Sequence, residues 1–222
     1  MHDEGSLRGQ GLPAKLLAEA GLIARRDDGS TYEVFFDRIT IPIHDARGQI
    51  IGFGGRVWPG RHGDKPKFVN SPETALFDKG RILFNQHRAA PLARPMAENR
   101  LIVVEGYLDV IALARAGFGA AVAPLGTALT ETQLERCWRL HNCPVLLFDG
   151  DGAGQRAALR AARMALPLVG PGRRLRVALL PEGLDPDDLL AREQGLAALE
   201  GVIDAALALD EFLLNAAMEG NL

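Results

Sequence analysis

The chain has 222 residues, of which 25 are basic and 28 acidic, giving a formal net charge of −3. Hydrophobic residues make up 47% and charged residues 24%, which excludes a disordered chain and allows one or two folded domains. No uncharged stretch reaches the roughly 20 apolar residues that a membrane-spanning helix needs, so we expect no membrane association.

The first half of the sequence favours short elements separated by Gly- and Pro-rich turns. Gly52, Gly54 and Gly55 are expected to weaken or bulge the strand in which they lie, because glycine destabilises a strand interior. In chain order, the patterns predict a helix over 13–20, a hairpin of strands 39–44 and 50–53, a loop over 59–80 and a helix over 81–93.

From residue 101 onward, short apolar runs alternate with helical patterns. Thr130 and Gln133 have the spacing of a helix N-terminal capping box. Strands that alternate with helices are typical of an α/β fold with a parallel sheet and right-handed crossovers. The expected strands are 101–104, 120–123, 145–148 and 175–180, and the expected helices are 107–117, 130–140, 153–166 and, as one helical region, 187–219.

Basic residues are concentrated in one part of the sequence. Residues 56–94 contain eight basic and three acidic residues, whereas residues 95–222 contain 11 basic and 17 acidic residues. Arg56, Lys67 and Lys79 lie among glycines and aromatic residues. Such a stretch indicates a surface that binds phosphate groups of a polyanion, and the alternative is a solvated charged face.

Acidic residues follow three of the predicted strands. Glu105 follows the first strand, Asp149 and Asp151 follow the third, and Asp185 and Asp187 follow the fourth. Because ligands bind outside the carboxyl ends of parallel strands, we expect these side chains to converge on one edge. Clustered carboxylates repel one another unless a cation binds, and all-oxygen ligation favours Mg²⁺ or Mn²⁺. The pattern therefore predicts a divalent-cation site suited to phosphoryl transfer.

Each of these acids also has a simpler alternative role. An Asp or Glu after a strand often caps the next helix. Asp109 lies one helical turn after Glu105, so it either faces the same site or is a first-turn acid favoured by the helix dipole. The sequence leaves both alternatives open.

The two cysteines point to packing roles in a reducing compartment. Cys137, His141 and Cys143 lie close in sequence, but structural zinc needs four ligands and no fourth is near, so we expect no zinc. Two cysteines cannot form a secreted disulfide framework, and the polar first residues show no secretory signal. We therefore expect a cytoplasmic protein.

The acidic motifs resemble those of the Toprim domain, and the segments upstream resemble the RNA polymerase domain of bacterial replicative primase. The resemblance runs from about residue 10 to residue 214. The motifs are R-I-T-I-P-I at 38–43, I-I-G-F-G-G-R-V at 50–57, P-K-F-V-N-S-P-E-T at 66–74, F-D-K-G-R at 77–81, V-V-E-G-Y-L-D at 103–109, L-F-D-G-D-G-A-G at 147–154 and G-L-D-P-D-D-L-L at 183–190.

This resemblance implies a DNA-directed RNA polymerase that makes short RNA primers on single-stranded DNA during replication, by metal-dependent nucleotidyl transfer. The implied catalytic residues are Glu105, Asp149 and Asp151. The implied ligands of Mg²⁺ or Mn²⁺ are Glu105, Asp149, Asp151, Asp185 and Asp187. The implied contacts to nucleotide or template are Arg56, Lys67, Asn70, Lys79 and Asp109.

The resemblance also implies an α/β architecture in which a Toprim parallel-sheet domain with flanking helices follows a mixed α/β basic subdomain. We expect the basic subdomain over 1–94, the Toprim domain over 95–190 and a C-terminal helical segment over 191–222. Because the family's zinc-binding and helicase-binding modules are not expected within this sequence, we interpret the chain as a fragment, and the sequence leaves open whether it is active alone.

The implied partners are a single-stranded DNA template, ribonucleoside triphosphates, the RNA primer and, through a module outside this chain, the replicative helicase. The implied location is the bacterial cytoplasm, in association with the nucleoid. Two other hypotheses remain open: another Toprim nuclease or phosphotransferase, and a non-catalytic fragment that binds single-stranded nucleic acid.

Overall fold

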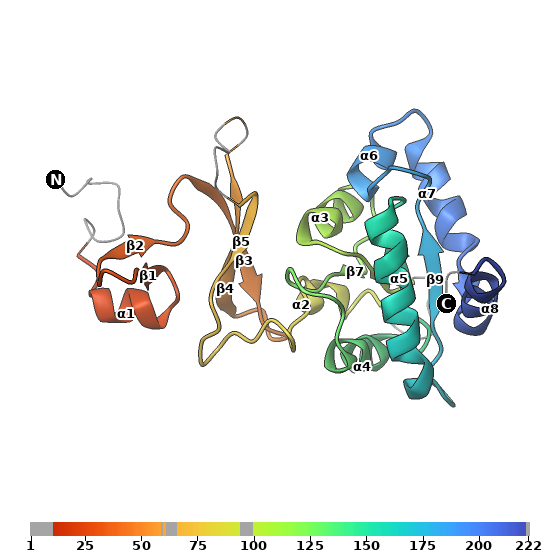
Figure 1. The fold of residues 1–222 in the computed structure, drawn as a ribbon, viewed down its shortest axis with the longest axis horizontal. Coiled ribbons are helices and arrows are strands. Elements are labelled where there is room, and N and C mark those ends of the chain that lie inside the picture. Colours follow the sequence, from red (N-terminus) through yellow and green to blue (C-terminus); the bar gives the residue numbers. More distant parts are fainter. Residues whose placement is uncertain (1–10, 59, 61–65, 94–99, 221–222) are drawn as a thin grey trace. The chain divides into compact units, whose positions relative to one another are not determined.

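The computed structural model describes residues 11–58, 60, 66–93 and 100–220, and the chain divides into two compact units between Asp78 and Lys79 (Figure 1). Arg61, Lys65 and Arg94 of the predicted basic stretch lie outside the described residues. In the described part, no helix has the length and apolar character needed to cross a bilayer. Contacts group residues 79–93 with the second unit, whereas the sequence placed them in the basic subdomain.

In residues 11–58, 60 and 66–78, the first unit has one short helix and two small antiparallel sheets (Figure 1). A two-stranded sheet and a three-stranded sheet of order β3-β4-β5 follow the helix. The expected helix and hairpin are both present, but the loop expected over 59–80 contains an additional strand, β5. The elements are α1 (Ala14–Glu19), β1 (Ile23–Arg25), β2 (Thr31–Glu33), β3 (Arg38–His44), β4 (Ile50–Val57) and β5 (Phe68–Asn70).

Strand β4 runs unbroken through its glycines, contrary to expectation. A Cβ atom on Gly52 would lie 3.3 Å from the Phe77 ring, and one on Gly55 would lie 2.7 Å from the Phe35 ring. The glycines therefore let aromatic rings pack directly on the strand, which compensates for their poor strand propensity. The irregularity in register occurs instead between Ile43 and His44 of β3.

The second unit is a five-stranded sheet with order β10-β9-β8-β6-β7, flanked by helices (Figure 1). Strands β7, β6, β8 and β9 are parallel, and β10 pairs antiparallel with β9. The elements are α2 (Gln86–Ala89), β6 (Ile102–Val103), α3 (Tyr107–Arg115), β7 (Ala121–Val122), α4 (Glu131–Leu140), β8 (Val145–Phe148), α5 (Gly152–Ala165), a 3₁₀ turn (Leu166–Leu168), β9 (Arg176–Leu179), α6 (Pro186–Leu190), α7 (Gly195–Asp204), β10 (Leu207–Ala208) and α8 (Leu209–Met218).

Two of the expected helices differ from the structure. The helix expected over 81–93 is reduced to the single turn α2, because Asn85 before it has a left-handed φ of 65° that a continuing helix does not allow. The helical region expected over 187–219 contains β10, which adds an antiparallel edge strand to the sheet. The parallel sheet itself agrees with the prediction.

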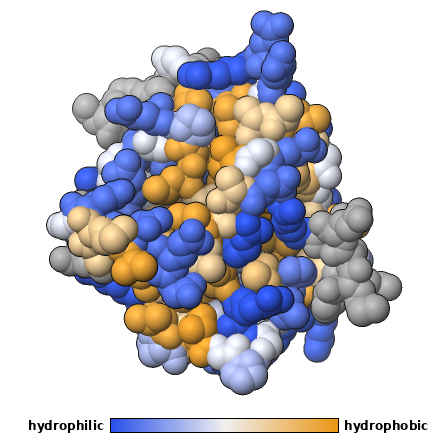
Figure 2. All heavy atoms as spheres, turned by 90° about the vertical axis from the view of Figure 1, so that its right-hand side faces the viewer, coloured by the Kyte–Doolittle hydropathy of each residue, from blue (hydrophilic) through white to orange (hydrophobic). Residues whose placement is uncertain are grey.

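One hydrophobic core holds the sheet of the second unit together. Leu146 of β8, Trp138 of α4, Ala162 of α5 and Phe212 of α8 belong to the same buried cluster, so α4, α5 and α8 share one layer. Helices α3, α6 and α7 contact one another in succession. The face that carries α7 and α8 shows apolar side chains between hydrophilic ones (Figure 2).

Candidate functional site

The carboxyl ends of β6, β8 and β9 lie side by side, because these strands are parallel neighbours. Glu105 follows β6, and Asp149 comes directly after β8. The backbone N–H of Asp149 donates a hydrogen bond to Glu105 Oε1 at 3.1 Å. The acids after these two strands are therefore in direct contact.

The loop after β8 is joined to the loop after β9 by two backbone hydrogen bonds. The Gly150 N–H donates to the carbonyl of Leu184 at 2.9 Å, and the Gly183 N–H donates to the carbonyl of Gly150 at 3.2 Å. A Cβ atom on Gly150 would lie 1.9 Å from the Pro181 carbonyl oxygen, so no larger residue fits. This close approach brings Asp185 to the same edge as Asp149.

Three of the acids also have local structural roles. Asp151 Oδ1 accepts from the Gly154 N–H at 2.7 Å and caps α5, and Asp185 Oδ1 accepts from the Asp188 N–H at 2.7 Å and caps α6. Asp109 Oδ2 accepts from the Gly106 N–H at 2.9 Å. The capping roles are therefore real, but a carboxylate has two oxygens and about four lone pairs, so they do not exclude ligand binding.

The pKa values of two acids show that the carboxylates act on one another. Burial raises the pKa of Asp149 to about 7, and the charges of Glu105, Asp109, Asp185 and Asp151 add to this effect. The pKa of Asp109 rises to about 6, again mainly through burial. The hydrogen bond from Gly106 opposes that rise, and the charges of three other acids support it: Asp185, Glu105 and Asp187. The predicted acids, with Asp109, thus form one electrostatically coupled acidic edge.

The acidic edge suits a divalent cation in its donor chemistry, which is entirely oxygen. Within the described ranges, no group of three or more His, Cys, Asp or Glu side chains is placed so that it could hold a metal ion, so the five implied ligands do not form one such group. Mg²⁺ is usually held by one or two carboxylates together with water and substrate phosphate oxygens, so a complete protein cage is not required. The residues present fit that partial mode of ligation.

Stability in the absence of cations is expected to fall as pH rises from about 4 to about 7. Asp149 titrates near 7 in the folded chain but near its ordinary value of 3.8 when unfolded, so the folded chain holds more protons in this range. Asp149→Asn removes this titration. In chelator, the melting temperature of Asp149→Asn minus that of wild type should increase steadily from about pH 4 to about pH 7. A difference that stays constant over this pH range would contradict the raised pKa of Asp149.

The predicted basic contacts divide between the two units. Arg56 on β4 lies opposite Phe68 on β5, and the Arg56 guanidinium and the Lys67 ammonium lie 5.9 and 5.4 Å from the centre of the Phe68 ring. Asn70 lies on the same strand two residues later, so its side chain shares the face of Phe68. We call these four residues the Phe68 patch. Lys79 and Asp109 belong to the second unit with the acidic edge.

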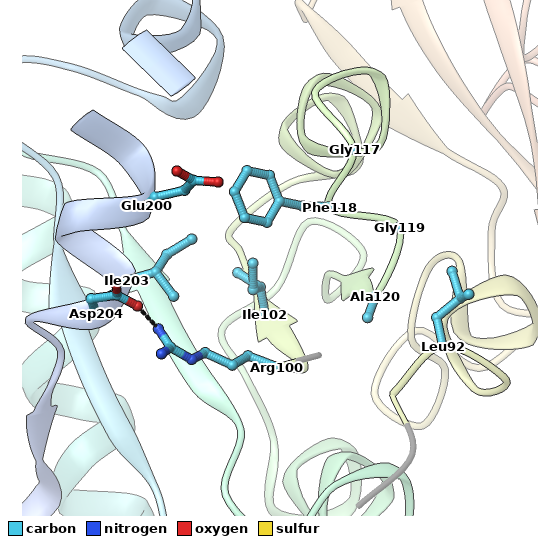
Figure 3. Close-up of a pocket in the computed structure, with 10 residues that line it drawn as sticks. All are labelled: Leu92, Arg100, Ile102, Gly117, Phe118, Gly119, Ala120, Glu200, Ile203 and Asp204. Carbon is cyan, nitrogen blue, oxygen red and sulfur yellow. Dashed lines mark hydrogen bonds and ion pairs between the residues drawn. The ribbon is translucent and has the colours of Figure 1, made fainter. Parts of the chain in front are cut away.

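Two hollows of the second unit differ in their relation to the acids. One, of about 520 Å³, is lined by Glu105, by Phe148 and by residues of α5 that include the buried Ala161. The other, of about 340 Å³, lies at the opposite edge, where β6 and β7 begin, and Arg100 there pairs with Asp204 (Figure 3). The second hollow therefore has no part in the acidic edge.

The expected capping box of Thr130 and Gln133 is present, and the structure adds two contacts that the sequence did not predict. Gly150 makes the contact that brings two acidic loops together, and the Asp-Gly-Asp spacing was the available signal. Gln133 contacts the backbone of residues 79–82, some fifty residues earlier in the sequence, which no local pattern indicates. Cys137 packs in the core, where burial raises the pKa of its thiol to about 12.

Two family descriptions match the sequence: the DNA primase catalytic core, N-terminal domain, over residues 4–90, and the Toprim domain over residues 99–178. The DNA primase of Escherichia coli K12 is 45% identical over 203 residues, which are 91% of this chain and 34% of that protein. The DNA primase of Rickettsia felis is 43% identical over 198 residues, which are 89% and 32%. The chain thus spans about a third of the length of the curated relatives it matches.

Solved structures agree with these matches. A DNA primase domain from Pseudomonas aeruginosa has a TM-score of 0.84 and 43% identity, covering 93% of this chain and 63% of that chain. A DnaG primase catalytic domain bound to single-stranded DNA has a TM-score of 0.86 and 41% identity, covering 98% and 67%. By sequence and by structure, this chain belongs to the family of DNA primase catalytic cores.

Proposed function

We propose that this chain is the catalytic core of a DNA-directed RNA polymerase that synthesises short RNA primers on single-stranded DNA. The observation that carries the proposal is the acidic edge, where carboxylates from three strand ends act on one another. The family assignment supports it, and one similar structure is a primase catalytic domain bound to single-stranded DNA. The substrates would be ribonucleoside triphosphates, the template and the growing primer.

Nucleotidyl transfer of this kind needs no nucleophilic side chain. The 3′-hydroxyl of one nucleotide attacks the α-phosphorus of the next, the bond to the bridging oxygen breaks, and pyrophosphate leaves. A divalent cation, when bound, lowers the barrier by neutralising charge on the phosphate oxygens. In this proposal Glu105, Asp149 and Asp151 are the catalytic residues and would hold the Mg²⁺ or Mn²⁺ ion beside the reacting phosphate. Asp185 and Asp187 would add negative charge that attracts the same ion.

The Phe68 patch of the first unit is proposed to bind template or nucleotide. Phe68 is 40% exposed, and the side chains of Arg56 and Lys67 lie near its ring. The patch therefore offers a nucleotide a surface on which its base can stack and two positive charges for its phosphates. Asn70 adds an amide on the same face, and Lys79 and Asp109 act from the second unit. Binding of single strands by aromatic and cationic side chains is sequence-tolerant, because every base has a face that can stack.

The boundaries 1–94, 95–190 and 191–222 remain our proposed functional division of the chain. We also propose that the protein acts in the bacterial cytoplasm at the nucleoid. The replicative helicase would bind it through a module that lies outside this chain.

The direct test supplies labelled single-stranded DNA, ribonucleoside triphosphates and Mg²⁺ or Mn²⁺, and follows product length. Primer synthesis predicts new RNA that lengthens with time and disappears in chelator. Shortening of the DNA without any need for triphosphates would instead identify a Toprim nuclease. Binding with no product and no response to chelator would identify a non-catalytic binding fragment.

Lys67→Ala is expected to weaken binding of single-stranded DNA and to reduce the slope of log affinity against log salt by about 0.7, the value for one phosphate contact on a single strand. Fluorescence anisotropy at several salt concentrations measures both quantities. Lys15→Ala is the matched control, because Lys15 is an exposed lysine on α1 of the same unit. An unchanged slope for Lys67→Ala would remove Lys67 from the Phe68 patch's binding role.

A further inference from the structure

The backbone of residues 79–82 is fastened to the first turn of α4. Gln133 on this turn is fully buried. Its Nε2 atom donates to the carbonyl oxygens of Lys79 and Ile82, each at 2.9 Å. Its Oε1 atom accepts from the Thr130 N–H at 3.0 Å. The single buried amide therefore uses both donor hydrogens and its oxygen at this junction.

Thr130 strengthens the same junction. Its Oγ1 atom donates to the carbonyl of Gly80 at 2.7 Å and accepts from the Gln133 N–H at 3.2 Å. Three of the four consecutive carbonyls from Lys79 to Ile82 are thus held by one capping box. A capping box needs only the reciprocal bonds between its own two residues, so the three bonds to this segment are additional.

The fastened segment lies at the same sheet edge as the acids. The Phe84 N–H donates to the Ala123 carbonyl at 2.8 Å, and the two residues form an antiparallel bridge. The residues before Phe84 therefore run beside those after Ala123, past the carboxyl end of β7, where α4 begins. The Phe84 ring also lies 5.8 Å from the ring of Tyr107, two residues after Glu105.

We propose that Thr130 and Gln133 are positioning residues that hold Lys79 and Arg81 ready for the phosphate groups of nucleotide or template. The inference rests on the proposed function, which gives Lys79 its phosphate contact. Lys79 is half-buried and Arg81 is exposed. With their backbone fixed in the folded chain, these cations lose less conformational freedom on binding than cations of a loose loop would.

The test replaces Gln133 with Met, which keeps the volume of the side chain but removes both donors. Loss of these hydrogen bonds is expected to weaken single-stranded DNA binding by about 3- to 10-fold. The salt slope should fall by about 0.7, as it should for Lys79→Ala. Affinity of the acidic edge for Mn²⁺, measured by electron paramagnetic resonance, should stay within about two-fold. Gln155→Met, an exposed residue of α5, is the matched control.

The double variant separates positioning from general destabilisation. If Gln133 acts through Lys79, then Lys79→Ala adds little further loss in the Gln133→Met background. Losses that add fully, or an unchanged salt slope in Gln133→Met, would overturn the positioning role. If Lys79→Ala alone leaves binding unchanged, the proposed phosphate contact of Lys79 is wrong, and the positioning role falls with it.

A second measurement covers the case in which Gln133→Met does not fold. Thr130→Val removes only the hydroxyl, and Thr130→Ser restores it. Trypsin cleaves after Lys79 and Arg81, and mass spectrometry of native-state digests reports each cut. Cleavage at these two sites should rise about 3- to 10-fold in Thr130→Val, because one hydrogen bond that holds the backbone is lost, and should return to the wild-type rate in Thr130→Ser. Equal rates in all three proteins would contradict the inference.

Discussion

Replacing Glu105 with Gln is expected to lower primer synthesis by about 100- to 1000-fold, the usual cost of removing one charge-stabilising group from an active site. The amide keeps an oxygen that can accept from the Asp149 N–H, so the fold should be retained. What is lost is the negative charge, which attracts the cation and which raises the pKa values of Asp149 and Asp109. The pKa values of both remaining acids should therefore fall in the variant.

Primer synthesis at saturating triphosphate measures the loss of activity. Mn²⁺ titration by electron paramagnetic resonance measures the expected loss of cation affinity without requiring activity. Affinity for single-stranded DNA should stay within about two-fold of wild type at fixed salt, because the proposed contacts to its phosphates are cationic. Glu131→Gln, an exposed acid in the first turn of α4, is the matched control and should leave synthesis unchanged. Wild-type synthesis by Glu105→Gln would show that the acidic edge is not catalytic.

Gly150→Ala is expected to lower the free energy of unfolding by about 3 kcal/mol and to weaken Mn²⁺ binding at the same time. The new methyl group would meet three backbone atoms: the Pro181 oxygen at 1.9 Å, the Pro181 carbon at 2.5 Å and the Leu180 oxygen at 2.7 Å. Backbone atoms cannot rotate away as a side chain can, so the two loops must separate. Both hydrogen bonds between them would lengthen, and Asp185 would move away from Asp149.

Urea denaturation monitored by circular dichroism gives the change in stability. Gly201→Ala is the matched control, since a Cβ atom on this exposed glycine of α7 has no neighbour within 4 Å. That control should gain up to about 1 kcal/mol, because alanine favours a helix over glycine. If Gly150→Ala is as stable as wild type, the close approach of the two loops is not required by the fold.

The acidic edge was predictable because its logic is topological. Glu105, Asp149 and Asp185 each follow an apolar run, and the helical patterns between these runs make the strands parallel. Parallel neighbours place their carboxyl ends together whatever the details of packing. The sequence could not decide between capping and ligand binding, and the structure shows why, since Asp151 and Asp185 are indeed helix caps within the same acidic edge.

Other features depend on contacts between residues far apart, and these escaped prediction. Strand β5 has three residues in a Gly- and Pro-rich region and exists only because it pairs with β4. Strand β10 likewise exists through its pairing with β9. The sequence predicted that residues 79–82 lie at the boundary between a loop and a helix. In the structure, Gln133 of α4 donates hydrogen bonds to two backbone carbonyls of this segment. Contacts of this kind between residues far apart in sequence cannot be predicted from the secondary-structure propensity of a short segment.

The hydrogen bonds between Gly150 and the loop that carries Gly183 and Leu184 join main-chain atoms alone. The spacing of the two strand ends is therefore set without the carboxyl groups that project from them. Exchanging those groups for amides or hydroxyls would alter the chemistry while leaving the frame in place, so reactivity and architecture at this edge can change independently of each other. A frame of this kind is a durable support on which different phosphate reactions could arise by substitution of a few side chains.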